Sequence, residues 1–168
     1  VHSPDDLRGM KLRVQESNIA VQMVRTLGGA ATPIAYGEVF TALQQGVVDG
    51  AENNPPSFHT SRHYEVAKYY SLDEHTAVPD LLLVSMNLWE GLNEEQRRWL
   101  QEAADESAVL QKELWREATE EALRVAREAG VEIIEPEKQA FLDRAAPLLD
   151  SYASDPEVGP LVQQIRNQ

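Results

Sequence analysis

Between residues 10 and 75, short apolar segments alternate with segments that carry helix-start signals, and this alternation limits the possible folds more than any other feature. Strands are expected over residues 10–14, 31–36 and 47–53, and each is followed directly by a helix. Strands that alternate with helices favour a parallel or mixed sheet that is covered on both faces. The sequence therefore predicts an α/β fold.

A polar or aromatic residue lies at the end of each of these strands: Arg13, Tyr36 and Asn53. In open α/β sheets, ligands bind outside the carboxyl ends of the strands. A guanidinium group can bind a carboxylate through two parallel hydrogen bonds, and a tyrosine ring can cover a ligand without adding charge. The three residues together indicate a site for a small organic anion, although Arg13 could also be solvated and Tyr36 could belong to the core.

Four further residues are candidates for the same site. Gln15 and Ser17 follow the first strand, Glu52 precedes Asn53, and His75 ends a later expected strand. Each also has a simpler interpretation, since Ser17 can cap the next helix and Glu52 and His75 can be solvated. As ligand contacts, they would bind the hydroxyl groups of a polar ligand.

The sequence gives little indication of metal binding or catalysis. His59 and His63 have a spacing that can bind a metal on one helical face, but no third ligand follows, so we expect no metal. There is no cysteine, no Gly-x-Ser-x-Gly motif and no phosphate-binding glycine loop, so we expect a binding protein without a cofactor. The enzymatic alternative is a small hydrolase that uses Glu52 or Glu38 as an acid and His75 as a base.

The charge balance limits the partners. The chain has 28 acidic residues against 15 lysine and arginine residues, a formal net charge of -13. Nucleic acid and anionic membrane surfaces repel such a chain, and we exclude both as partners. No apolar segment approaches the length of a membrane span, and no signal peptide opens the sequence. Residues 1–6 read as a start within a loop, so we expect that further chain precedes them.

The second half is dominated by one helical pattern over residues 92–129, which Gly130 ends. A helix of about 37 residues is roughly 55 Å long. A compact body of this chain length is only about 40 Å across, so the helix must kink or reach beyond the domain. We expect charged residues 94–128 to form its solvated face, and Trp99 and Trp115 to be core anchors.

The remaining elements complete the expected organisation. They are a helix over 54–67, strands over 68–75, 81–89 and 131–135, and helices over 136–152 and 156–166. Residues 1–90 are expected to form an α/β ligand-binding lobe, residues 91–130 a spanning helix, and residues 131–168 a C-terminal strand with helices.

Three segments resemble one family. They read DLRGMKLRV over residues 6–14, TPIAYGEV over 32–39 and ALQQGVVDGAEN over 42–53, and the likeness continues through HYEVAKY over 63–69 and LVS over 83–85. The combination resembles the DctP-type solute-binding proteins of tripartite ATP-independent periplasmic (TRAP) transporters. The resemblance implies that Arg13 binds the ligand carboxylate, that Tyr36 packs on the ligand, and that Asn53 hydrogen-bonds the acid group.

The resemblance also implies that the complete protein is larger than this chain. Members of the family have an N-terminal lobe of about equal size and a signal peptide, so this chain resembles the C-terminal half of a periplasmic-binding-protein-like fold, with the N-terminal lobe largely absent. In that family the two lobes close on the ligand, and the membrane subunits recognise the closed form. The chain is therefore expected to be part of a periplasmic receptor that performs no chemistry.

The expected ligand is an organic acid. Arg13-Val14-Gln15-Glu16-Ser17 and Glu52-Asn53-Asn54-Pro55 resemble members that bind sugar acids such as uronates. A dicarboxylate or another monocarboxylate remains the alternative ligand. A further alternative is an association module, because a lobe without its counterpart exposes strand edges and a helix face that can pair in an edge-paired or domain-swapped dimer.

Overall fold

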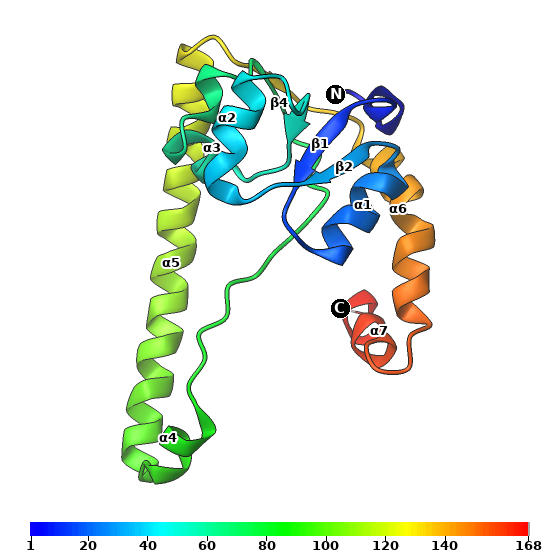
Figure 1. Cartoon of the computed structure of the whole chain (residues 1–168). Helices are drawn as coiled ribbons and strands as arrows, with labels where there is room; N and C mark the ends of the chain where they lie inside the picture. The colour runs from blue at the N-terminus through cyan, green and yellow to red at the C-terminus, as the bar shows by residue number, and fades with distance from the viewer. Residues whose placement is uncertain (168) are drawn as a thin grey trace.

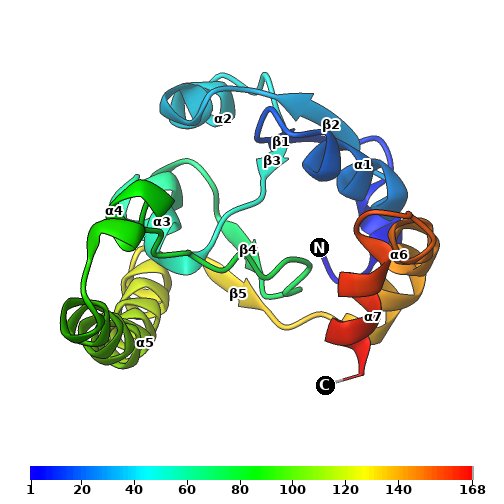
Figure 2. The ribbon, with the colours of Figure 1, turned by 90° about the horizontal axis from the view of Figure 1, so that it is seen from below.

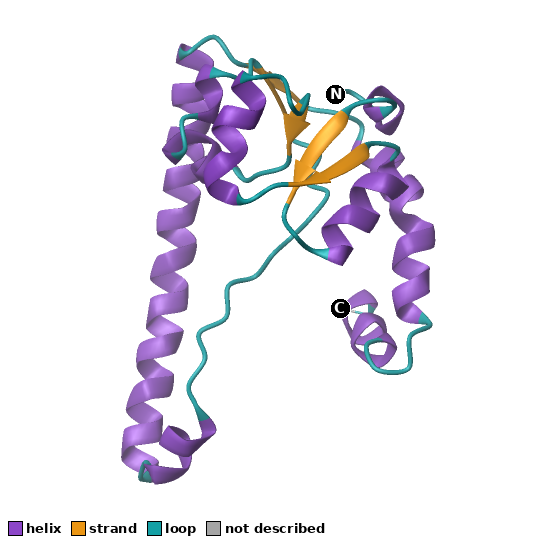
Figure 3. Cartoon of the chain, viewed as in Figure 1, coloured by secondary structure: helices purple, strands orange, loops and turns teal. Residues whose placement is uncertain are grey.

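The computed structural model describes residues 1–167, and its first half is built around a small parallel sheet (Figure 1, Figure 3). Its elements are η1 (Pro4–Leu7), β1 (Lys11–Val14), α1 (Asn18–Leu27), β2 (Ala30–Pro33), η2 (Tyr36–Glu38), α2 (Val39–Gln44) and β3 (Gly50–Ala51). The strand order is β2-β1-β3, and both pairs are parallel. Strand β1 is therefore central, with Arg13 opposite Thr32 on one side and Ala51 on the other.

The second half contains a second parallel sheet and the long helix. Its elements are α3 (Pro55–Thr60), η3 (His63–Glu65), β4 (Tyr69–Ser71), α4 (Met86–Gly91), α5 (Glu94–Glu128), β5 (Glu132–Ile134), α6 (Lys138–Ala153) and α7 (Gly159–Arg166). Strands β4 and β5 pair in parallel, apart from the first sheet (Figure 2). The expected α/β fold is confirmed, and the strand pairs within residues 1–167 are all parallel.

Local signals in the sequence explain the helix boundaries. The side chain of Ser17 accepts a hydrogen bond from Ala20 N at the start of α1, and Gly28 ends that helix with φ 109°. Asn54 caps α3 in the same way, with Pro55 in the first turn, where a missing N–H costs nothing. Asn93 and Gln96 form a reciprocal capping box at the start of α5.

Two apolar clusters hold the chain together. In the first, α1 packs against the sheet and against α6, and the buried residues are Leu7, Val14, Met23, Val24, Leu27 and Phe141. In the second, α3 packs on the C-terminal end of α5 through Phe58, Ala126 and Val131. The site lies between these clusters, so both halves of the described chain position it.

Helix α5 is one continuous helix of 35 residues, which at 1.5 Å per residue is about 52 Å long. Its buried residues, Ala122 and Ala126, lie near the C-terminal end, and the rest of the rod extends away from both sheets (Figure 1). The sequence left two outcomes open, a kinked helix or a helix that reaches beyond the domain, and the structure shows the second. The prediction that Trp99 and Trp115 are core anchors is wrong: 54% of Trp99 and 44% of Trp115 are exposed, because no described element buries this stretch of α5.

The expected strand over residues 81–89 is also wrong. Residues 72–85 have no regular secondary structure, and residues 86–91 form helix α4. The segment crosses from the sheets to α4, beside the N-terminal end of α5 (Figure 1), with Leu81, Leu82 and Leu83 largely exposed. Its apolar run fits a buried strand, but a strand needs a neighbour to satisfy its backbone groups, and no strand pairs with this segment in the described chain.

Several strands and helices are shorter than the sequence predicted. Strand β2 ends at Pro33, so Tyr36 lies in the 3-10 turn that follows, and β3 ends at Ala51, two residues before Asn53. The helix expected over 54–67 ends at Thr60, because Arg62 adopts a left-handed conformation with φ 56°. Strand β4 covers only residues 69–71 of the expected 68–75. Among residues 1–167, no helix is both long and apolar enough to cross a membrane.

Candidate functional site

Arg13 is the buried cation of the site. It lies on the central strand β1 and is only 3% exposed. Its Nε atom donates a hydrogen bond to Ile34 O at 2.9 Å, which fixes the plane of the guanidinium group. One Nη atom lies 3.9 Å from Glu52 Oε1, too far for a hydrogen bond. A guanidinium held at Nε keeps its two Nη atoms for an anion that approaches from the other side.

Tyr36 lies beside Arg13. The Arg13 Cζ atom is 5.7 Å from the centre of the Tyr36 ring, and the Tyr36 hydroxyl lies 2.6 Å from Ser61 Oγ. Burial raises the pKa of Tyr36, but hydrogen bonding with Ser61, Asn53 and Ser57 outweighs burial, so that the pKa is lowered. The ring is half exposed, and the contact with Ser61 holds its hydroxyl in place.

Asn53 is fixed from two sides. Its side-chain oxygen accepts a hydrogen bond from Asn54 N at 2.9 Å, and its main-chain oxygen accepts one from the Tyr70 hydroxyl at 2.6 Å. Burial is the main cause of the raised pKa of Tyr70, so this hydroxyl stays protonated and remains a donor. The side-chain amide group of Asn53 is thereby oriented by its own backbone and by β4.

A cluster formed by Glu52, Asp73 and His75, called the acidic wall below, begins beside Arg13 at Glu52. His75 Nδ1 and Asp73 Oδ1 are 2.7 Å apart. Burial lowers the pKa of His75, but the hydrogen bond and the charge of Asp73, with a smaller effect of Glu52, leave it raised. Burial also raises the pKa of Glu52, against the opposing charges of His75 and Arg13.

All these side chains line one large open cavity of about 1720 Å³, called the central hollow below. Of the seven expected site residues, the structure brings six to this hollow: Arg13, Gln15, Tyr36, Glu52, Asn53 and His75. Ser17 does not line it, because its side chain caps α1. The ends of β1, β2 and β3 and the loop after β4 thus meet at a common hollow, as parallel topology requires.

Of the two histidines at metal-binding spacing, His63 also lines the central hollow, whereas His59 does not. His59 is in α3, whereas His63 is in η3, 3% exposed, with its ring edge-on to those of Tyr36 and Phe58. Burial, and next the charge of Arg13, lower the pKa of His63. Within residues 1–167, no group of three or more His, Cys, Asp or Glu side chains is arranged to hold a metal.

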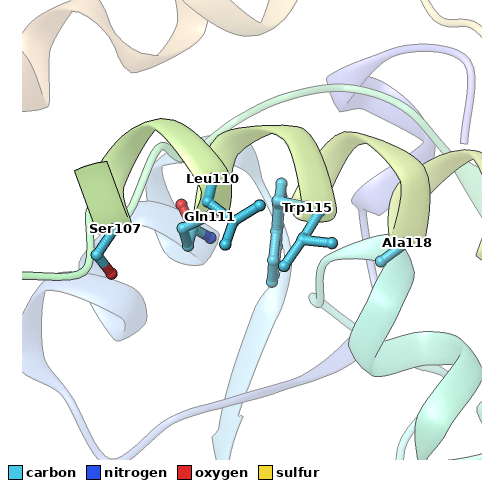
Figure 4. A pocket seen from close by; sticks show the side chains of 6 residues that line it. Ser107, Leu110, Gln111, Trp115 and Ala118 are labelled. Carbon is cyan, nitrogen blue, oxygen red and sulfur yellow. The ribbon is translucent and has the colours of Figure 1, made fainter. Parts of the chain in front are cut away.

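A second, smaller hollow of about 350 Å³ lies entirely on α5 (Figure 4). It is lined by Ser107, Leu110, Gln111, Leu114, Trp115 and Ala118. Its lining contains no charged side chain and comes from a single helix. This hollow is therefore an uncovered helix face and offers no group for binding an anion.

Sequence reasoning missed Asp73, Tyr70 and Ser61. Each acts on an expected residue: Asp73 on His75, Tyr70 on the backbone of Asn53, and Ser61 on the hydroxyl of Tyr36. The sequence carried one usable signal, the spacing of Asp73 and His75 on either side of Glu74 at the end of a strand. The other two contacts join residues 17 and 25 positions apart, and no local pattern encodes them.

The fold is that of one half of a TRAP periplasmic solute-binding protein. The model of the family described as bacterial extracellular solute-binding protein, family 7 (DctP), matches residues 1–155. The chain belongs to this family.

Individual relatives support the family assignment. A solute-binding protein from Chromohalobacter salexigens is 44% identical over 169 residues, which cover 99% of this chain and 50% of the relative. A crystal structure of a TRAP periplasmic solute-binding protein from C. salexigens, with bound D-glucuronate, matches with a TM-score of 0.91 at 44% identity over 99% of this chain and 56% of that one. A Sulfitobacter structure with bound β-D-galacturonate matches with a TM-score of 0.90 at 40% identity, over 100% and 57% of the two chains.

These matches confirm the resemblance and set its extent. The chain spans about half the length of the relatives it matches. This extent agrees with the expectation that the chain corresponds to one half of such a protein.

Proposed function

We propose that this chain is the C-terminal ligand-binding half of a periplasmic receptor that binds an organic acid, in particular a uronate, and delivers it to a TRAP transporter. The observation that carries the proposal is Arg13: a buried guanidinium, fixed at Nε, that lines an open hollow. The two similar structures that hold glucuronate and galacturonate support this class of ligand.

Each residue of the site has a proposed role. Arg13 binds the ligand carboxylate through its Nη atoms, and the Tyr36 ring covers one face of the ligand. Asn53 donates to the same acid group, while Gln15, Glu52 and His75 bind ligand hydroxyls. We also propose the domain boundaries expected at residues 90 and 130. They separate the ligand-binding lobe from α5, a brace that a second lobe would also contact.

The site supports binding and not turnover. Glu38 is exposed in η2 and does not line the hollow, so it is not placed to act with His75. The Oγ atom of Ser71, a serine that does line the hollow, donates to Val1 O at 2.9 Å and is not directed at His75. Glu52 and His75 do line the hollow, but the relatives that the chain matches are solute-binding proteins, so we expect that no glycoside or ester is turned over.

The test is a binding titration of the chain with D-glucuronate, followed by NMR so that weak affinity can be measured. Arg13→Gln should weaken binding at least roughly tenfold, because charge-assisted hydrogen bonds contribute about 1.5–3 kcal/mol. Arg13→Lys keeps the charge but loses the two-pronged geometry, so it should also bind more weakly.

The matched control is Arg8→Gln, which removes the same charge from an exposed side chain. Binding by the control should equal that of the unaltered chain. Wild-type affinity in Arg13→Gln would refute the proposed clamp.

A further inference from the structure

The charges around the central hollow are unbalanced. Seven acidic side chains line it, against the three lysine and arginine side chains Arg13, Lys68 and Lys112. Only Arg13 among these three cations is buried. A ligand with one carboxylate can therefore pair with Arg13, but a second carboxylate would meet mainly acidic groups.

The acidic wall is held in a defined place. Asp73 is fixed by its 2.7 Å contact with His75, and Glu52 is kept near Arg13 by the 3.9 Å ion pair. The side chains of Glu52 and Asp73 are 22% and 19% exposed, so solvent screens their charges only in part. Carboxylate oxygens accept hydrogen bonds from ligand hydroxyls and repel a ligand carboxylate.

We propose that Asp73 and Glu52 are specificity-determining residues, which make the central hollow select polyhydroxy monocarboxylates against dicarboxylates. Arg13 neutralises the single ligand carboxylate, and the carboxylate oxygens of the wall accept hydrogen bonds from ligand hydroxyl groups. This inference rests on the proposed function, because it takes Arg13 as the anchor of the carboxylate.

The test compares D-glucuronate with D-glucarate, a sugar acid of the same carbon number with a carboxylate at both ends. The unaltered chain should bind D-glucuronate roughly tenfold more tightly than D-glucarate. This is the size of effect expected for one uncompensated charge at a partly screened distance. The two acids also differ in ring form, so the change in this ratio on mutation isolates the effect of charge.

Asp73→Asn and Glu52→Gln keep side-chain size and remove one charge each. Each should reduce the preference at least roughly threefold, mainly by strengthening the binding of D-glucarate. The matched control is Asp80→Asn, which removes a charge from an exposed residue at the same hollow and should leave the preference unchanged.

The outcomes separate the two proposals. Equal affinity of the unaltered chain for both acids, or an unchanged ratio in both wall variants, overturns the selective wall and leaves the proposed function standing. Failure of the unaltered chain to bind either acid overturns the proposed function, and this inference with it.

Discussion

The hydrogen bond from Arg13 Nε to Ile34 O determines how the guanidinium can be used. Ile34 follows β2 directly, so the neighbouring strand of the sheet fixes the orientation of a side chain that projects from β1. A buried arginine loses much of its hydration, and its remaining donors then favour an anion strongly. The backbone of the sheet thus prepares the cation before any ligand is present.

His63 gives a prediction for the pH dependence of stability. Its folded pKa lies below the unfolded value because of burial and the charge of Arg13. The unfolded chain therefore binds the proton more readily, so stability is complete above a pH of about 6.5 and falls as the pH decreases toward the folded pKa. His63→Phe, which keeps an aromatic ring at the position, should lessen the loss of unfolding free energy between about pH 6.5 and 5.

Chemical denaturation at a series of pH values measures this difference. His2→Phe serves as the control, since His2 shows no such burial, and its profile should follow that of the unaltered chain. A His63→Phe profile parallel to that of the unaltered chain would show that His63 does not titrate in the folded state as described.

At this scale, the sequence predicted the residues whose position follows from topology. Arg13, Tyr36 and Asn53 could be placed together because parallel strands end at one edge of a sheet. Ser17 could not be assigned from pattern alone, because a serine after a strand suits both a helix cap and a ligand contact. Tyr70 and Ser61 could not be assigned, because their contacts with Asn53 and Tyr36 join residues 17 and 25 positions apart.

The uncovered face of α5 is the main feature at the scale of the elements. Leu110, Leu114 and Trp115 are exposed on it, and the segment over residues 72–85 has no strand partner in the described chain. The sequence predicted the helix because its capping box and its length are local properties. It could not predict the fate of residues 81–89, because a strand depends on a neighbour that local sequence does not supply.

This face should cause self-association of the chain when it is alone in solution, as the expected edge-paired or swapped dimer requires. Leu114→Glu should weaken association because it places a charge at the centre of the apolar stripe. Leu149→Glu, at an exposed position of α6, is the control. Light scattering over a range of concentrations measures the effect, and a monomer at every concentration would contradict the expectation.

The whole molecule has too much surface for its size. A compact monomer of 18.8 kDa exposes about 8300 Å², whereas this chain exposes 11627 Å². The excess is larger than the roughly 800 Å² that each partner buries in an ordinary interface. It is the amount expected of a lobe that packs against a second body of similar size, in keeping with its coverage of about half of each relative.

A second lobe over the hollow would also change the energetics of binding. Closure would exclude water from the proposed ion pair between Arg13 and the ligand, and this would strengthen the electrostatic interaction. The chain alone should therefore bind its ligand more weakly than a two-lobed receptor does.

The most direct measurement is a crystal structure of this chain with D-glucuronate. We expect the sugar carboxylate to lie in the central hollow, with both oxygens about 2.8 Å from the Nη atoms of Arg13 and the ring against Tyr36. A uronate bound elsewhere, or bound in the hollow with its carboxylate turned away from Arg13, would contradict the account.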